Sequence, residues 1–200
     1  MTHVSRLSSD AGGVRNAWSM LLLGLALAFG FGGVCGTTSA ETSPALQQTI
    51  EDVARKWPAV THIAADEVAR LMTEKTAVIF DVRTPEEFAV SHLDGAVRID
   101  PAADAAVFLK EHGTSVKGKT AVFYCSVGVR SSKLTARVAD GLKAAGAAAS
   151  GELKGGIFAW AGDARPLVDA KGPTDKVHGY DSSWGKLVKD PKTLETKERQ

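Results

Sequence analysis

The stretch Thr120–Ser132, TAVFYCSVGVRSS, decides the fold of this chain. Its first five residues form an apolar, β-rich run that predicts a buried strand, and a helix-forming segment follows Arg130. Cys125 therefore stands between the carboxyl end of a strand and the first turn of a helix. Helix N-termini carry unpaired N–H groups and a partial positive charge, and both favour a thiolate over a thiol. We predict that Cys125 is a reactive nucleophile.

A second run of the same kind lies earlier in the chain. Residues 76–81, TAVIFD, match residues 120–125, TAVFYC, and each run ends in a polar residue at the same offset. Strands that are apolar on both faces and alternate with helices indicate an α/β fold, with a mostly parallel sheet and helices on both faces. Ligands of such sheets bind outside the carboxyl ends of the strands, so Asp81 and Cys125 are expected to share one pocket rim.

Further elements follow from periodicity and from capping signals. Strands are expected near residue 63, at 76–82, 97–99 and 120–124. Helices are expected at 45–57, from about 65 to 72, from Thr84 onward, and at 102–111, 131–145 and 157–160. Asp81 is expected either to orient Arg130 or the loop amides, or to serve as an ordinary turn or cap residue. Arg83 is expected to pair with Glu86 or Glu87.

The first forty residues have the pattern of a signal peptide. Two basic residues precede an apolar run at 18–31, and Thr38-Ser39-Ala40 resembles a cleavage site. We expect export to the periplasm after cleavage near Ala40; the alternative is an uncleaved membrane anchor. The formal charge of the full chain is +1, and loss of residues 1–40 brings it to zero. This argues against a nucleic-acid or anionic-membrane surface.

The cysteine count supports the prediction for Cys125. The chain has two cysteines, and Cys35 would leave with the signal peptide. An exported chain with one cysteine has no internal disulfide, so its thiol is a candidate reactive group. The alternative is a buried structural cysteine. The histidines are scattered without metal-ligand spacing, so no metal site is expected.

Three separated blocks give the chain a resemblance to a known family. The blocks are 81–88 with 91–96, DVRTPEEF and SHLDGA; 124–131, YCSVGVRS; and 153–160, LKGGIFAW. In their order and spacing they resemble a single-domain rhodanese, from about Ile63 to Val168. With this resemblance we divide the chain into a signal peptide at 1–40, a helical extension at 41–60, a rhodanese domain at 61–170 and a tail at 171–200.

The resemblance implies a sulfurtransferase. In the family the cysteine takes a sulfane sulfur from a donor such as thiosulfate, becomes a persulfide, and passes the sulfur to a thiol, cyanide or a protein relay partner. A curled loop of backbone N–H groups holds the persulfide without a metal or cofactor. Gly128 would permit the curl, Arg130 would suit an oxyanion, and Ser131 could cap the following helix. The expected loop is Ser126, Val127, Gly128, Val129, Arg130 and Ser131, supported by Asp81 and Arg83.

The loop length separates the alternatives. Cysteine phosphatases also join a cysteine, a curled loop and an arginine, but with five residues between the two, which suits a phosphate. Here four residues lie between Cys125 and Arg130, and the smaller ring suits a single sulfur atom. A non-catalytic module that senses persulfides or binds a partner is a further alternative. Tyr180 and Trp184 lie in the tail, which is expected to strap over the domain or to dock a partner.

Overall fold

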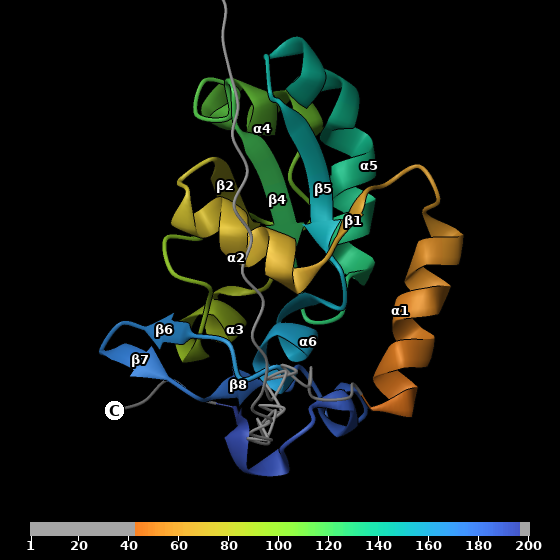
Figure 1. Ribbon diagram of the computed structural model, residues 1–200, viewed down its shortest axis with the longest axis vertical. Coiled ribbons are helices and arrows are strands. Elements are labelled where there is room, and N and C mark those ends of the chain that lie inside the picture. Colours follow the sequence, from red (N-terminus) through yellow and green to blue (C-terminus); the bar gives the residue numbers. More distant parts are fainter. Residues whose placement is uncertain (1–42, 197–200) are drawn as a thin grey trace, which may run out of the picture. The chain divides into compact units, whose positions relative to one another are not determined.

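A five-stranded parallel sheet forms the centre of the computed structural model, which describes residues 43–196 (Figure 1). Its strand order is β1-β5-β4-β2-β3. The bounds are His62–Ile63 for β1, Ala77–Asp81 for β2, Val97–Arg98 for β3, Thr120–Tyr124 for β4 and Ala149–Leu153 for β5. Strands β2 and β4 are neighbours in parallel register, with Ala77 opposite Thr120 and Asp81 opposite Tyr124. The predicted α/β class and parallel sheet are confirmed.

Helices cover both faces of this sheet. The bounds are Pro44–Lys56 for α1, Ala65–Thr73 for α2, Pro85–Val90 for α3, Ala105–His112 for α4, Val129–Ala144 for α5 and Gly156–Gly162 for α6. Leu134, Val138 and Leu142 of α5 pack with Phe108 of α4 on one face. On the other face, residues of α1, α2 and α6 share a core with Ile79 and Val122 of the sheet. The site can therefore form at the carboxyl edge of the sheet, which the helices leave accessible.

Strand β5 is the strand of the central sheet that sequence patterns did not predict. Its sequence, ASGEL, has no β-branched or aromatic residue, so its strand propensity is low. It forms because it pairs with β4 on one side and with β1 on the other. Tertiary pairing thus overrides local preference, and it places Glu152 next to the loop that follows β4.

The chain beyond the sheet returns to its carboxyl edge. Strands β6 (Leu167–Asp169) and β7 (Gly172–Thr174) form an antiparallel pair. Strands β8 (Val177–His178) and β9 (Leu194–Glu195) enclose two 3-10 turns, η1 (Trp184–Leu187) and η2 (Pro191–Thr193). Figure 1 shows this C-terminal segment, in dark blue, lying beyond the ends of the sheet strands and beside α6.

The predicted signal peptide and its alternative, a membrane anchor, fall on residues 1–42, outside the described residues. Between residues 43 and 196, no helix is both long enough and apolar enough to cross a membrane.

Candidate active site

Cys125 lies at the junction between β4 and α5, as the sequence predicts. Its side chain is buried, and the backbone N–H of Gly128 donates to its Sγ over 3.2 Å. Helix α5 begins at Val129, and Gly128 before it has a φ of 103°, a left-handed conformation that glycine adopts at little cost. The loop thus curls back on itself, and the amide of Gly128, just before α5, points at the sulfur.

The loop is fixed from the other side by the start of α6. The N–H of Ile157 donates to the carbonyl of Cys125 over 2.9 Å, and that of Phe158 to the carbonyl of Ser126 over 3.1 Å. Gly156 has a φ of +59°, and a Cβ there would lie 2.4 Å from the Cys125 oxygen. The glycine pair at the start of α6, Gly155 and Gly156, therefore permits the close approach that holds the cysteine loop in place.

Arg130 forms a bidentate ion pair with Glu87 of α3. Both terminal nitrogens of the guanidinium lie 2.7 Å from a Glu87 oxygen, and one also donates to Ser126 Oγ over 2.9 Å. Burial raises the pKa of Glu87, but the hydrogen bonds and charge of Arg130 outweigh it and hold that pKa at about 2. Burial lowers the pKa of Arg130, but the hydrogen bonds and charge interactions with Glu87 and Cys125 together raise it. The guanidinium therefore stays charged beside the sulfur.

Asp81 and Arg83 do not contact Arg130, so the first alternative for Asp81 and the predicted partner of Arg83 are wrong. The second alternative for Asp81, a turn residue, agrees with the hydrogen bond of 3.0 Å that its Oδ1 accepts from the backbone N–H of Arg83. Asp81 accepts from Arg83 Nε over 2.9 Å and from the Tyr124 hydroxyl over 2.6 Å. Arg83, which was expected to pair with Glu86 or Glu87, pairs with Asp81 and donates to the carbonyl of Ser91 over 2.6 Å. Arg83 and Asp81 are fully buried, so their charges must compensate each other. The pair supports the strand ends rather than orienting Arg130.

Ser131 has a different place from the predicted one. It lies inside α5, so Gly128 rather than Ser131 occupies the cap position. Its hydroxyl lies 3.6 Å from the sulfur of Cys125 and donates to Glu152 Oε2 over 3.3 Å. Burial and the negative charge at Cys125 raise the pKa of Glu152 to about 9. The other oxygen of Glu152 lies 2.6 Å from Nδ1 of His62.

A pocket of about 170 Å³ opens onto the cysteine. It is lined by Cys125, Ser126, Val127, Val129 and Arg130 of the loop, and by Tyr180 and Trp184 of the C-terminal segment. The guanidinium carbon of Arg130 lies 5.0 Å from the centre of the Tyr180 ring, a cation–π contact. The tail therefore straps over the domain, as one of the two predictions for it proposed, and it supplies an aromatic wall to the site.

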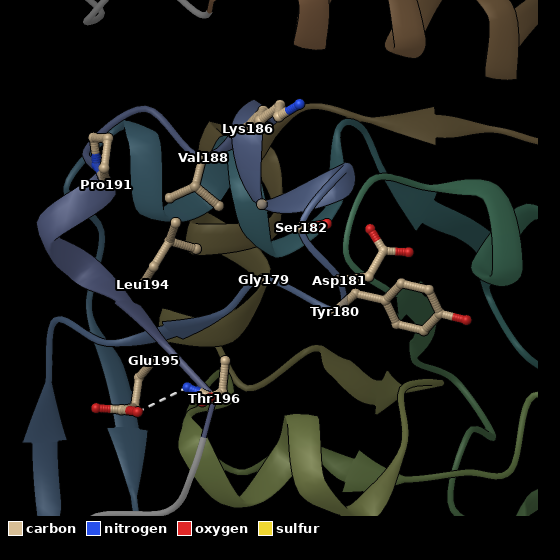
Figure 2. Close-up of a pocket in the computed structure, with 11 residues that line it drawn as sticks. Gly179, Tyr180, Asp181, Ser182, Lys186, Val188, Pro191, Leu194, Glu195 and Thr196 are labelled. Carbon is tan, nitrogen blue, oxygen red and sulfur yellow. Dashed lines mark hydrogen bonds between the residues drawn. The ribbon is translucent and has the colours of Figure 1, made fainter.

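The tail also forms a pocket of its own, about 420 Å³ in volume, beside the first one. Figure 2 shows Val188 and Leu194 facing each other across it, with the ring of Tyr180 at its edge. Tyr180 has a φ of 65°, uncommon for a residue with a side chain, and it lines both pockets. Its ring is thus the boundary between the cysteine pocket and the tail pocket.

The structure brings the predicted loop residues 125–131 together, but it adds side chains that the sequence analysis did not assign. Glu87 is one of these, because it forms the ion pair that fixes Arg130. Its position three residues after Thr84 marks a capping box, and that pattern alone does not indicate a functional site. Glu152 gave no such signal, because its strand, β5, was not predicted from the sequence. Among residues 43–196, no group of three or more His, Cys, Asp or Glu side chains is arranged to hold a metal ion.

Residues 64–163 match the family model for the rhodanese-like domain. The chain belongs to the rhodanese-like family. This rhodanese-like domain includes the cysteine loop, Glu87 and Glu152, whereas Tyr180 and Trp184 lie beyond the matched residues. The aromatic wall of the pocket is therefore supplied from outside the matched region.

Relatives and solved structures agree with this placement. The probable adenylyltransferase/sulfurtransferase MoeZ of Mycobacterium tuberculosis is 37% identical over 92 residues, which cover 44% of this chain and 21% of MoeZ. The tRNA uridine(34) hydroxylase of Buchnera aphidicola is 28% identical over 111 residues, covering 52% of this chain and 33% of that protein. A thiosulfate sulfurtransferase from Pseudomonas aeruginosa shares the fold at a TM-score of 0.50 and 19% identity, over 72% of this chain and 26% of that one. The rhodanese-like chain thus spans between about a fifth and a third of these proteins.

Proposed function

We propose that this protein is a sulfurtransferase that carries a sulfane sulfur on Cys125 as a persulfide. The observation that carries the proposal is the position of the sulfur: buried, 3.2 Å from the Gly128 amide, at the mouth of α5 and facing a small pocket. The amide, the helix N-terminus and the nearby Arg130 all favour an anion at this point. A persulfide is such an anion, one sulfur longer than the thiolate.

The reaction divides into two balanced steps. In the first, the Cys125 thiolate attacks the outer sulfur of a donor such as thiosulfate; a new S–S bond forms, the donor S–S bond breaks, and sulfite leaves with the electron pair. In the second, a thiolate or cyanide attacks the terminal sulfur and restores the Cys125 thiolate. The Gly128 amide and the N-terminus of α5 favour an anion at this point in both states, and such preorganised charge stabilisation lowers a barrier.

The arrangement of Arg130 favours this reaction over phosphate hydrolysis. Its terminal nitrogens face Glu87 and Ser126 rather than pointing as a free fork into the pocket. A phosphoryl group needs such a fork, together with a wider loop than the four residues between Cys125 and Arg130 provide. We therefore assign Arg130 the roles of fixing the loop and supplying a positive charge, rather than clamping the donor.

Mass spectrometry of the purified full-length protein tests the proposal. Incubation with thiosulfate should add one sulfur atom to the peptide that contains Cys125, and cyanide or a thiol should remove it. Cys125→Ser, which preserves the size of the side chain, should prevent the gain. No gain with thiosulfate or with an organic persulfide would refute the enzyme and favour the alternative of a partner-binding module. An aryl phosphatase rate that equals the thiosulfate rate and disappears in Cys125→Ser would overturn the reaction class.

The physiological route is a further part of the proposal. The resemblance to MoeZ, a protein named as a sulfurtransferase, supports a relay in which another protein supplies or takes the sulfur. The N-terminal sequence supports export to the periplasm. N-terminal sequencing of the protein recovered from a periplasmic fraction should begin at Glu41; a start at Met1 in the membrane fraction would instead show the anchor.

A further inference from the structure

A chain of polar contacts leads away from the sulfur through residues that do not line the pocket. Ser131 Oγ lies 3.6 Å from Cys125 Sγ and 3.3 Å from Oε2 of Glu152, and Oε1 of Glu152 lies 2.6 Å from Nδ1 of His62. The Glu152 side chain is 1% exposed and the His62 side chain is 16% exposed. The contacts therefore join a buried thiol to a side chain that reaches solvent, through residues of α5, β5 and β1.

We propose that Ser131, Glu152 and His62 form a proton relay that carries the thiol proton of Cys125 to the imidazole of His62. The thiolate is then balanced by an imidazolium on the far side of a neutral carboxyl. Glu152 and His62 do not touch the sulfur, so they are positioning residues that act through Ser131. The inference deepens the proposed function, because the thiolate is the form that attacks a sulfur donor.

The relay conserves protons and charge. The S–H bond of Cys125 breaks and its electron pair stays on sulfur, while Ser131 Oγ takes the proton and passes its own to Oε2 of Glu152. Oε1 of Glu152 releases the proton that it held, and the lone pair on Nδ1 of His62 accepts it. Glu152 begins and ends as a neutral carboxyl, and the products are one thiolate and one imidazolium.

The hydrogen-bond partner of the second imidazole nitrogen supports the required tautomer. Nε2 of His62 lies 3.3 Å from the backbone oxygen of Trp57, and a carbonyl oxygen can only accept. Nε2 therefore carries a hydrogen, which in the neutral ring leaves Nδ1 as an acceptor facing Glu152. A protonated carboxyl at Glu152 satisfies this contact at 2.6 Å.

The charges around Glu152 also favour its neutral form. Burial is the main influence that raises its pKa, and the negative charge at Cys125 adds to it. The hydrogen bond from Ser131 and the charge of Lys154, just beyond β5, act in the opposite direction and are weaker, so the pKa is raised to about 9. Two anions, a thiolate and a carboxylate, would repel each other in this dry space, and a proton on Glu152 removes that repulsion.

A fixed ion pair between a Glu152 carboxylate and a His62 imidazolium is the competing arrangement. It would place a negative charge behind the sulfur and oppose the thiolate, so removal of that charge would lower the pH at which the thiolate forms. The relay predicts no such fall, because Gln replaces a carboxyl that is already neutral, whereas replacing His62 removes the imidazolium that balances the thiolate and raises that pH. The two arrangements can therefore be separated by one measurement.

The measurement is the rate at which iodoacetamide alkylates Cys125 in the full-length protein as a function of pH, followed by mass spectrometry of the Cys125 peptide. Glu152→Gln keeps the shape of the carboxyl and its hydrogen-bond pattern but cannot pass a proton. We expect the midpoint of the profile to rise by roughly one pH unit in His62→Gln, to stay unchanged in Glu152→Gln, and to rise by no more in the double variant than in His62→Gln. Glu67→Gln, an exposed change on α2, is the matched control and should leave the midpoint unchanged.

A lower midpoint in Glu152→Gln, or an unchanged one in His62→Gln, would overturn the relay. If His62→Gln fails to fold, the NMR signals of His62 in the wild type give a second test. Alkylation of Cys125 at neutral pH should then shift them from imidazolium to neutral imidazole, and no shift would contradict the relay. Neither test uses a sulfur donor, so a protein that fails to transfer sulfur would still report on the relay.

Discussion

Replacing Glu87 by glutamine isolates the charge of the pair that fixes the catalytic loop. The Glu87 side chain is 1% exposed, and both of its oxygens accept from Arg130 at 2.7 Å. Its pKa falls from the usual 4.5 to about 2 in the folded protein, which corresponds to about 3 kcal/mol of stability at neutral pH. Glutamine retains the size and can still complete the capping box with Thr84, so the loss should reflect the charge.

The sign of the pH dependence follows from the direction of this pKa. Because the folded pKa is below the unfolded one, the contribution of Glu87 is fully present above about pH 4.5 and is lost as the pH falls toward about 2. Wild type should therefore exceed Glu87→Gln in free energy of unfolding by about 3 kcal/mol at neutral pH, and the two should converge in acid. Urea denaturation across this range, followed by circular dichroism, measures the difference.

Glu86→Gln provides the matched control, since Glu86 is an exposed neighbour in the same helical turn. It should leave the free energy of unfolding close to that of the wild type. The reasoning about Glu87 is refuted if its substitution costs less than about 1 kcal/mol at neutral pH, or if the difference persists unchanged in acid. The first result would mean that the ion pair contributes no more than a surface pair does. The second would mean that the loss does not come from the charge of Glu87.

Three further changes test other parts of the structure. Glu152→Gln should have the opposite pH dependence to Glu87→Gln. Because the pKa of Glu152 is raised in the folded protein, the contribution of Glu152 to folding is fully present below about pH 4.5 and is lost as the pH rises toward about 9. The melting temperature of the variant should therefore rise relative to that of the wild type as the pH rises. A melting temperature of the variant that falls with pH as steeply as that of the wild type would contradict this prediction. Gly156→Ala should cost about 2–3 kcal/mol in urea denaturation, because its Cβ would lie 2.4 Å from the Cys125 oxygen at a positive φ; a neutral effect would show that α6 does not fix the loop. Tyr180→Ala should widen the pocket and raise kcat/KM for a bulky thiol acceptor several-fold relative to cyanide; an equal ratio in both proteins would place Tyr180 outside the acceptor path.

Much of the active-site loop could be predicted from residues that are close in sequence. The position of Cys125 between a strand and a helix, the turn at Gly128 and the two buried TAV strands depend on local patterns, and the structure confirms them. Periodicity and capping signals are local, so a single chain contains the information. The partners of the charged residues were predicted less well, because Glu87 and Arg83 could each have found several partners within reach.

The sequence by itself determined the α/β class, the place of Cys125 between a strand and a helix, and the curl of the loop at Gly128, because each depends on patterns within single strands, helices and turns. Only the tertiary structure decided which charges face each other: Glu87 with Arg130, Asp81 with Arg83, and Glu152 with His62. Strand β5 illustrates the reason. Its own sequence does not favour a strand, but its pairing with β1 and β4 buries Glu152 behind the cysteine, where the loss of water and the nearby sulfur set its protonation.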